Sequence, residues 1–165
     1  MAVLQRISPC LWFDTQAEDA ARFYCDIFPN SSIVHISHYT DAGFEHHGRQ
    51  AGEVLTVDFI LDGQQYTALN GGPVFQFNPA ISLQVFCESQ EEVDHYWDKL
   101  GEGGDPRAQQ CGWLADRFGV SWQVVPVALI DIMKHPDRAR VDRAFNVMLG
   151  MKKLEIAPLL EAFGK

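Results

Sequence analysis

The sequence predicts an α+β protein built from two tandem βαβββ units, followed by a helical C-terminal tail. Three observations predict this fold class: a repeated segment, a helix-start signal in each copy, and a turn signal before each returning strand. Residues 7–18, ISPCLWFDTQAE, are echoed 74 positions later by residues 81–92, ISLQVFCESQEE. An internal repeat of this kind indicates a duplicated supersecondary unit.

In the first copy, a strand is expected to run directly into an amphipathic helix. Thr15 and Glu18 have the spacing of a capping box, in which a hydroxyl and a carboxylate satisfy free backbone donors at a helix start. Ala17, Ala21 and Tyr24 then recur at helical spacing. This pattern predicts a helix with one apolar face packed on a sheet.

Three further strands are expected to complete the first copy. The segments SIVHISHY and VLTVDFIL have the composition of strands, and a polar loop separates them. Asp62-Gly63 is a strong signal for a two-residue hairpin turn. The segment QYTALN is therefore predicted to return antiparallel to VLTVDFIL.

The second copy repeats this plan in less space. Ser89 and Glu92 again have capping-box spacing. After the helix, RAQQCGWLAD is expected to supply two short strands or one bent strand, and SWQVVP the returning strand. Aligning the turn glycines of the two copies places Thr67 opposite Gln123.

The tail lies outside the repeat and carries two helical patterns. Asp137 can cap a helix that bears Val141 and Phe145 on one face and that Gly150 can end. Pro158 suits the first turn of a last helix. Such a tail can pack on its own domain, the simpler expectation, or clasp a second subunit. The expected layout is paired units over residues 1–126 (about 4–72 and 78–126) and a helical extension over residues 127–165.

Several longer segments carry a resemblance to a known family. The chain resembles the PhnB-like branch, often labelled demethylubiquinone methyltransferase, of the vicinal-oxygen-chelate or glyoxalase/bleomycin-resistance superfamily. The resemblance implies two βαβββ units enclosing a cavity and a homodimer. It leaves open whether the protein is an enzyme, because one fold hosts many chemistries. The segments that carry it are SPCLWFD, ALNGGP, AISLQVFC, DRFGVSWQVVP and LGMKKLEI.

In metal-dependent members of this superfamily, the first and last strands of each unit supply the ligands of a divalent ion. Carried over by the repeat, those positions here are Ser8, Thr67, Ser82 and Gln123. Three hydroxyls and one amide are poor ligands for zinc or iron, which prefer imidazole, thiolate or carboxylate. We therefore expect no bound metal and no other cofactor.

Alternation along the same strands predicts a face with aromatic walls and a few polar groups, as small-molecule pockets have. An alternative is that Trp12 and Phe86 merely fill the space between the sheets. The leading hypothesis is a metal-free protein that binds a small-molecule ligand. The predicted ligand-binding residues are Ser8, Cys10, Trp12, Thr67, Ser82, Gln84, Phe86 and Gln123.

Two residues are candidates for catalysis. Asp58 interrupts an apolar run, where burying a carboxylate without partners is costly. It is a candidate general acid/base or ligand contact, although an exposed edge-strand position is the plainer interpretation. Cys10 is a candidate nucleophile if a base lies nearby. Otherwise the four cysteines, which have no CxxC spacing, are expected to be reduced packing groups.

Two alternative functions stay open. One is a metal-dependent lyase, isomerase or dioxygenase with ligands such as His35 or His38 together with Asp58. The other is a structural dimerisation module. A methyltransferase is not expected, because the glycine-rich residues 100–106 follow a helix, whereas a glycine-rich nucleotide loop follows a strand. The adjacent His46-His47 pair is interpreted as part of a surface loop.

The bulk composition excludes two classes of partner. The net charge of −9 repels a phosphate backbone, so nucleic acid is not expected. No segment approaches the roughly 18 apolar residues of a membrane span, and the first residues lack the apolar stretch of a signal peptide. A cytoplasmic protein without a membrane partner is the expectation.

Overall fold

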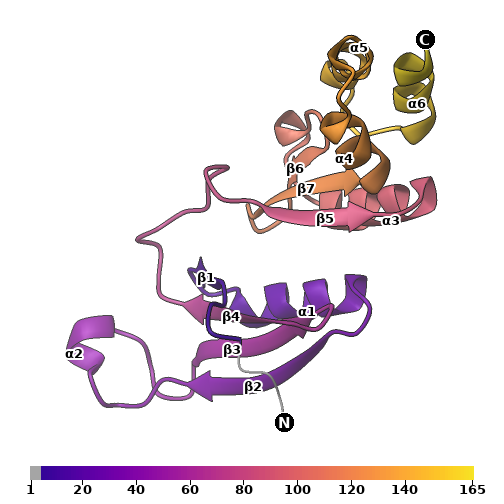
Figure 1. The fold of residues 1–165 in the computed structure, drawn as a ribbon. Helices are drawn as coiled ribbons and strands as arrows, with labels where there is room; N and C mark the ends of the chain where they lie inside the picture. The colour runs from indigo at the N-terminus through magenta and orange to yellow at the C-terminus, as the bar shows by residue number, and fades with distance from the viewer. Residues whose placement is uncertain (1–4) are drawn as a thin grey trace. The chain divides into compact units, whose positions relative to one another are not determined.

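The computed structural model describes residues 5–165, which form two compact units (Figure 1). The first unit extends through Phe77, and the second comprises Asn78–Lys165. Each unit contains one sheet with a helix packed on it. Among the described residues, no helix is both long enough and apolar enough to cross a membrane.

The first unit is the predicted βαβββ unit. The order of strands in its sheet is β1-β4-β3-β2, in which β1 runs parallel to β4 and the other neighbours are antiparallel. A short helix, α2, lies inside the loop that was expected to be polar. The elements are β1 (Cys10–Phe13), α1 (Ala17–Ile27), β2 (Ser32–His38), α2 (Phe44–His47), β3 (Val54–Leu61) and β4 (Gln64–Asn70).

Helix α1 covers one face of this sheet. Tyr24 of α1 stacks on Phe59 of β3, with ring centroids 6.4 Å apart, and both side chains are buried. Val57 and Leu61 share that face, because successive side chains of a strand point to opposite sides. Asp58 therefore lies on the face away from α1, which we call the helix-free face of the first sheet.

The start of α1 differs from the predicted capping box. Neither Thr15 nor Glu18 caps the helix through its side chain. Asn70, at the end of β4 and only 6% exposed, accepts a hydrogen bond from the Ala17 amide at 2.8 Å. Its amide group also donates to the Val54 carbonyl at 3.1 Å. A buried side chain from a distant strand thus performs the task expected of the local hydroxyl.

The predicted hairpin between β3 and β4 is confirmed. Asp62 and Gly63 have φ angles of 45° and 79°, the left-handed values that a two-residue hairpin turn requires. The strand register continues directly from Leu61 paired with Gln64. The turn therefore fixes which residues of β3 and β4 face each other.

The second unit contains a shorter sheet and the C-terminal helices. The strand order is β5-β7-β6, with β5 parallel to β7, as β1 is to β4 in the first unit. The elements are β5 (Leu83–Cys87), α3 (Gln90–Gly101), the 3-10 helix η1 (Pro106–Ala108), β6 (Trp113–Ala115), β7 (Ser121–Pro126), α4 (Val127–Lys134), α5 (Arg138–Leu149) and α6 (Ile156–Gly164).

No counterpart of β2 is present in residues 78–165. At that place the chain forms η1 and a single bridge between Gln110 and Trp113. The predicted choice between two short strands and one bent strand therefore resolves into one strand, β6, preceded by an isolated bridge. Residues 102–112 join α3 to β6, a shorter connection than residues 28–53, which contain β2 in the first unit.

The helix starts of the second unit agree with the sequence. Ser89 accepts a hydrogen bond from the Glu92 amide at 3.3 Å, and the Glu92 carboxylate accepts one from the Glu88 amide at 2.7 Å. Asp137 caps α5, and Gly150 follows the helix end. Pro158 lies in the first turn of α6, as predicted, whereas α4 is an additional helix that starts directly after β7.

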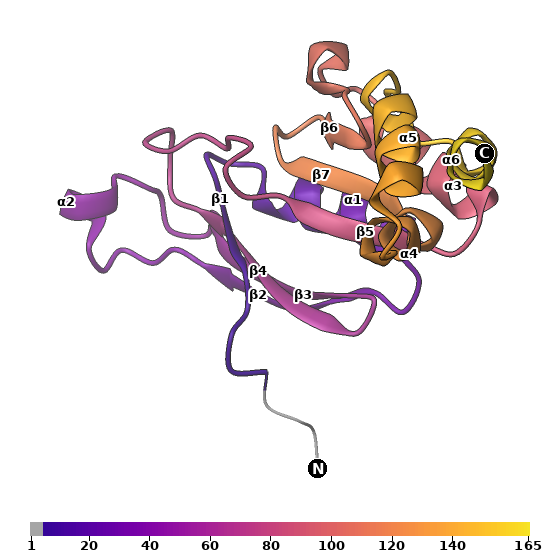
Figure 2. The same ribbon diagram turned by 45° about the horizontal axis from the view of Figure 1, so that its top comes forward.

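The three C-terminal helices lie against one another (Figure 2). They share one apolar cluster. The tail is also bonded to the sheet region, because the amides of Cys111 and Gly112 donate to the carbonyls of Met151 and Lys152 at 2.9 and 2.7 Å. The tail therefore belongs to the second unit. The buried members of the cluster are Leu129, Ile132, Ala144, Leu154 and Leu159.

Candidate functional site

A row of four side chains crosses the helix-free face of the first sheet. The strand register aligns Cys10 of β1 with Thr67 of β4, Thr67 with Asp58 of β3, and Asp58 with His35 of β2. The Thr67 hydroxyl donates a hydrogen bond to Oδ1 of Asp58 at 2.8 Å. Two of the predicted ligand-binding residues and the Asp58 carboxylate therefore lie together.

Asp58 is half-buried at the centre of this row. Its strand, β3, lies between β4 and β2, so the edge-strand interpretation of Asp58 is wrong. Among residues 5–165, no Lys, Arg or His forms an ion pair with its carboxylate. The Thr67 hydroxyl occupies one of the roughly four acceptor positions of a carboxylate. Asp58 thus retains acceptor capacity toward a ligand.

Cys10 is exposed but poorly suited to act as a nucleophile. Partial burial of the sulfur and, second, the negative charge of Asp58 raise the pKa of the Cys10 thiol. The reactive form of a cysteine is the thiolate, which a raised pKa makes scarcer. In the described chain, Cys10 is therefore better placed to contact a ligand as a neutral thiol.

Trp12 lies on the same face, two residues beyond Cys10. Its indole nitrogen donates to the Gly72 carbonyl at 2.9 Å, and its ring lies 5.0 Å from that of Phe75 in an edge-on arrangement. A Cβ atom at Gly71 would come within 2.2 Å of the indole ring. These contacts hold the Trp12 ring in one orientation and form an aromatic wall at one end of the face.

The second sheet carries the corresponding residues in the same register. Gln84 of β5 is aligned with Gln123 of β7, as Cys10 is with Thr67, which agrees with the alignment of the turn glycines. The Gln123 amide donates to the Ser82 hydroxyl at 2.8 Å. Phe86, two residues after Gln84, is exposed on the same face, while Val85 is buried on the opposite one.

The side chains at the four carried-over metal positions do not fit a zinc or iron ion. The Ser8 hydroxyl donates to the Gln65 carbonyl at 2.6 Å, the Thr67 hydroxyl to Asp58, and the Gln123 amide to Ser82. These donors are neutral, and none is an imidazole, thiolate or carboxylate. In the part of the chain that the structure describes, no group of three or more His, Cys, Asp or Glu side chains could hold a metal ion.

The ligands of the rival metal hypothesis are only partly brought together. His35 and Asp58 are aligned across β2 and β3, but His38 is aligned with Val54 at the far end of β3. His46 is exposed, and His47 receives a hydrogen bond from a backbone amide within its own loop. The surface-loop interpretation of this histidine pair therefore agrees with the structure.

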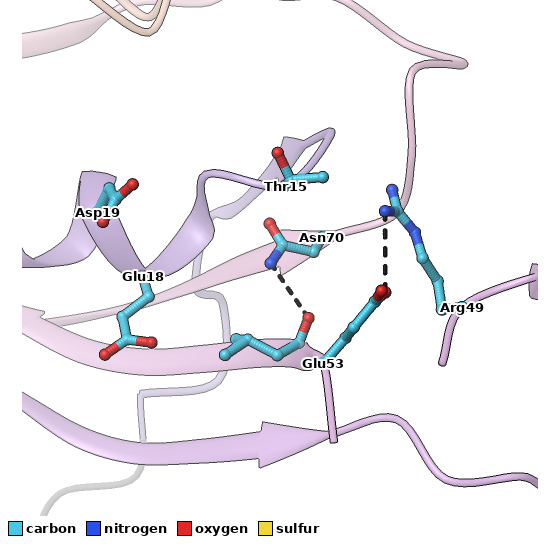
Figure 3. A pocket seen from close by; sticks show the side chains of 7 residues that line it. Thr15, Glu18, Asp19, Arg49, Glu53 and Asn70 are labelled. Carbon is cyan, nitrogen blue, oxygen red and sulfur yellow. Dashed lines mark hydrogen bonds and ion pairs between the residues drawn. The ribbon is translucent and has the colours of Figure 1, made fainter. Parts of the chain in front are cut away.

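A separate pocket of ≈ 330 Å³ lies where α1 begins (Figure 3). The guanidinium of Arg49 contacts Asp14 at 2.9 Å and Glu53 at 3.9 Å, and the Arg49 and Glu53 side chains point toward each other (Figure 3). These groups neutralise one another and tie the loop after β2 to the start of α1. The lining residues are Thr15, Glu18, Asp19, Arg49, Glu53, Val54 and Asn70.

The sequence interpretation missed the role of Arg49. The residue lies in a polar loop, and its partner Asp14 is 35 positions away. No local pattern identifies an arginine that bridges elements so distant in the chain. The charged groups at this pocket are bound to one another in ion pairs, which indicates a structural role. In the row around Asp58, by contrast, the carboxylate can still accept hydrogen bonds from a ligand.

Comparisons with known proteins agree with this architecture. A family model described as 3-demethylubiquinone-9 3-methyltransferase matches residues 5–125. The structure of a PhnB protein from Bacillus cereus is similar, with a TM-score of 0.62 and 36% identity, and the match covers 74% of this chain and 99% of that one. A search of the curated proteins finds no match.

More distant structures share the fold. Protein PA1353 from Pseudomonas aeruginosa has a TM-score of 0.56 at 19% identity, over 75% of this chain and 98% of that one. The fosfomycin resistance protein FosX from Listeria monocytogenes, in its monoclinic form, has a TM-score of 0.52 at 17% identity, over 81% and 100% of the two chains. The matching family model ends at residue 125, before α4.

Proposed function

Because this chain belongs to the PhnB-like family described as 3-demethylubiquinone-9 3-methyltransferase, in the glyoxalase/bleomycin-resistance superfamily, we propose that it binds a small organic molecule on its helix-free sheet faces. The row of Cys10, Thr67, Asp58 and His35 beside the fixed Trp12 ring carries this proposal. A few polar groups set against aromatic and apolar walls are typical of small-molecule sites.

The donor chemistry supports binding without a metal. Neutral hydroxyls and an amide occupy the positions at which metal-dependent relatives would place ligands, and each is engaged with a protein partner. The polar groups left to meet a ligand on the first sheet are the Asp58 carboxylate, the Cys10 thiol and the His35 ring. We propose that these side chains, rather than a metal ion, hold the ligand.

The strand-to-helix connections of this chain do not favour methyl transfer. Short segments without glycine join β1 to α1 and β5 to α3. A glycine-rich turn between strand and helix is the usual place for a nucleotide-like methyl donor. Both connections therefore favour ligand binding over methyl transfer. The homodimer and the cytoplasmic location expected from the sequence stay predictions.

Two measurements test the proposed function. Elemental analysis of the purified protein and thermal melts with and without added Zn²⁺, Mn²⁺ or Fe²⁺ test the metal-free part. We expect no stoichiometric metal and no shift of the melting temperature, whereas a bound metal would stabilise the folded state by mass action. Stoichiometric metal, or a marked stabilisation by one of these ions, would replace the proposal with the metal-dependent alternative.

An NMR screen of aromatic fragments tests the binding part. We expect ligands to perturb backbone amides of β1, β3 and β4 more than those of α1. Trp12→Ala should weaken binding because it removes the aromatic wall, while Phe44→Ala, at an exposed aromatic residue of α2, serves as the control. If no fragment perturbs either sheet, the structural-module alternative is favoured instead.

A further inference from the structure

We infer that the helix-free face of the first sheet selects a ligand with a protonated amine attached to a flat apolar body. This inference rests on the proposed function and names the chemical class of the ligand. The feature that carries it is Asp58, a half-buried carboxylate on an interior strand with which no Lys, Arg or His of residues 5–165 forms an ion pair.

A half-buried carboxylate loses part of its hydration, and a partner with opposite charge can compensate that loss. Removing a charged group from water without a partner is strongly unfavourable, and one hydroxyl donor compensates it only in part. In residues 5–165, the Thr67 hydroxyl donates a side-chain hydrogen bond to Asp58, at 2.8 Å. A ligand ammonium group would supply both the missing charge and up to three further N–H donors.

His35, aligned with Asp58 across β2 and β3, forms no ion pair with it, and other neighbouring positions of the face are engaged or neutral. Thr56, two residues before Asp58, is hydrogen-bonded to Ser37 across the strands. Cys10, at the end of the row, keeps its proton because burial and the Asp58 charge raise its pKa. The negative net charge of the whole chain also attracts cations and repels anions.

Apolar groups flank the carboxylate on both sides along the strands. Ile60 follows Asp58 on the same face of β3, and Leu69 follows Thr67 on β4. Trp12 is aligned with Leu69 and closes this end of the face. An aromatic or otherwise flat body can therefore lie on Trp12 and Leu69 while its amine reaches Asp58.

Three probes of equal size separate charge from shape. Benzylamine, benzyl alcohol and benzoate share one aromatic ring and are cationic, neutral and anionic near pH 7. Each is titrated into the isotope-labelled full chain while the amides of β1, β3 and β4 are followed by NMR. We expect the Kd of benzylamine to be at least tenfold lower than that of benzyl alcohol, and benzoate to bind most weakly.

Two matched variants assign the selectivity to Asp58. Asp58→Asn keeps the shape and an acceptor for Thr67 but removes the charge, so it should raise the benzylamine Kd at least tenfold, about 1.4 kcal/mol. Asp62→Asn removes the same charge from the exposed turn of the same hairpin, where φ of 45° suits asparagine. This control should leave the Kd unchanged within twofold.

Each other outcome has a definite meaning. If the three probes bind the face equally well, the amine inference is overturned while the proposed binding function stands. An equal loss in both variants would assign the effect to net charge and would also overturn the inference. If no aromatic fragment binds the helix-free face of either sheet, the proposed function itself fails. The comparison of probes on the unmodified chain keeps the test decisive even if Asp58→Asn does not fold.

Discussion

The start of α1 gives the sharpest stability test, because one buried side chain performs the capping. Asn70→Ala removes the acceptor for the Ala17 amide, at 2.8 Å, and the donor to the Val54 carbonyl, at 3.1 Å. Each lost hydrogen bond costs about 1 kcal/mol net, and a buried group left without a partner adds about 1–3 kcal/mol. We therefore expect the free energy of unfolding of the first unit to fall by roughly 2–4 kcal/mol.

The assay has to report on the first unit alone. Urea denaturation meets this need when hydrogen exchange of the α1 amides is the readout. In addition, the melting temperature should fall by roughly 5–15 °C for a chain of this size. Thr15→Ala is the matched control, because Thr15 makes no side-chain cap, and should change stability by less than about 0.5 kcal/mol. Ser89→Ala removes a real cap in the second unit and should cost about 1 kcal/mol.

The opposite ranking would refute this reasoning. If Thr15→Ala destabilised the first unit as much as Asn70→Ala does, the capping box predicted from the sequence would be the true helix start. If Asn70→Ala cost less than about 1 kcal/mol, the two hydrogen bonds would contribute no more than a solvent-exposed pair.

Three further predictions concern other parts of the molecule. Gly71→Ala places a Cβ 2.2 Å from the Trp12 ring, so we expect altered tryptophan fluorescence and a loss of about 1–3 kcal/mol; unchanged emission and stability would contradict this. Burial raises the pKa of Cys87 from about 9 to about 12, so the folded state keeps a proton that the unfolded chain loses. Stability should therefore fall as pH rises from about 9 toward 12, and Cys87→Ala should flatten that part of a urea-derived profile. Gln90→Ala removes the acceptor of the first amide of α6, at 2.8 Å, and a donor to the Leu154 carbonyl; exchange of that amide should accelerate and stability fall by about 1–2 kcal/mol. Unchanged exchange would show that packing alone holds the tail.

The two capping boxes show what a sequence can and cannot predict. The same pattern is correct at Ser89 and wrong at Thr15, although the two segments are copies of each other. The difference lies in Asn70, which accepts a hydrogen bond from the Ala17 amide although it lies more than fifty positions further along the chain. The start of α3 is capped by Ser89 instead. Local patterns predict local hydrogen bonds, and a distant partner can replace them without leaving any local signal.

Strand pairing shows the same contrast between what local sequence predicts and what depends on distant residues. Asp62-Gly63 fixes the β3–β4 register, and the repeat correctly aligns Thr67 with Gln123, because both depend on short stretches of chain. The missing strand of the second unit depends on chain length between α3 and β6, which allowed two interpretations. The interior position of Asp58 depends on strand order, which no segment of the sequence encodes alone.

The placement of the candidate residues on the sheet could be predicted in part, whereas their role in binding stays a prediction. Alternation along a strand places Cys10 and Trp12 on one face, and the structure agrees. The contact between Asp58 and Thr67 follows from the hairpin register, but the sequence interpretation did not draw it. The alignment of His35 with Asp58 requires the order of all strands in the sheet, so it becomes visible only in the structure.

The parallel pairing of the first and last strands in each unit also determines when that unit can fold during synthesis. The segment before β1 is bonded to β4 across 57 positions of sequence. At roughly 5–20 residues per second, the ribosome needs about 3–11 s to deliver that partner. During this interval, β1 has an unpaired edge, and α1 lacks the side chain that caps it. Each unit therefore closes in a single late step, when its last strand emerges, and a pause of the ribosome before that strand would prolong the period in which the nascent chain can aggregate.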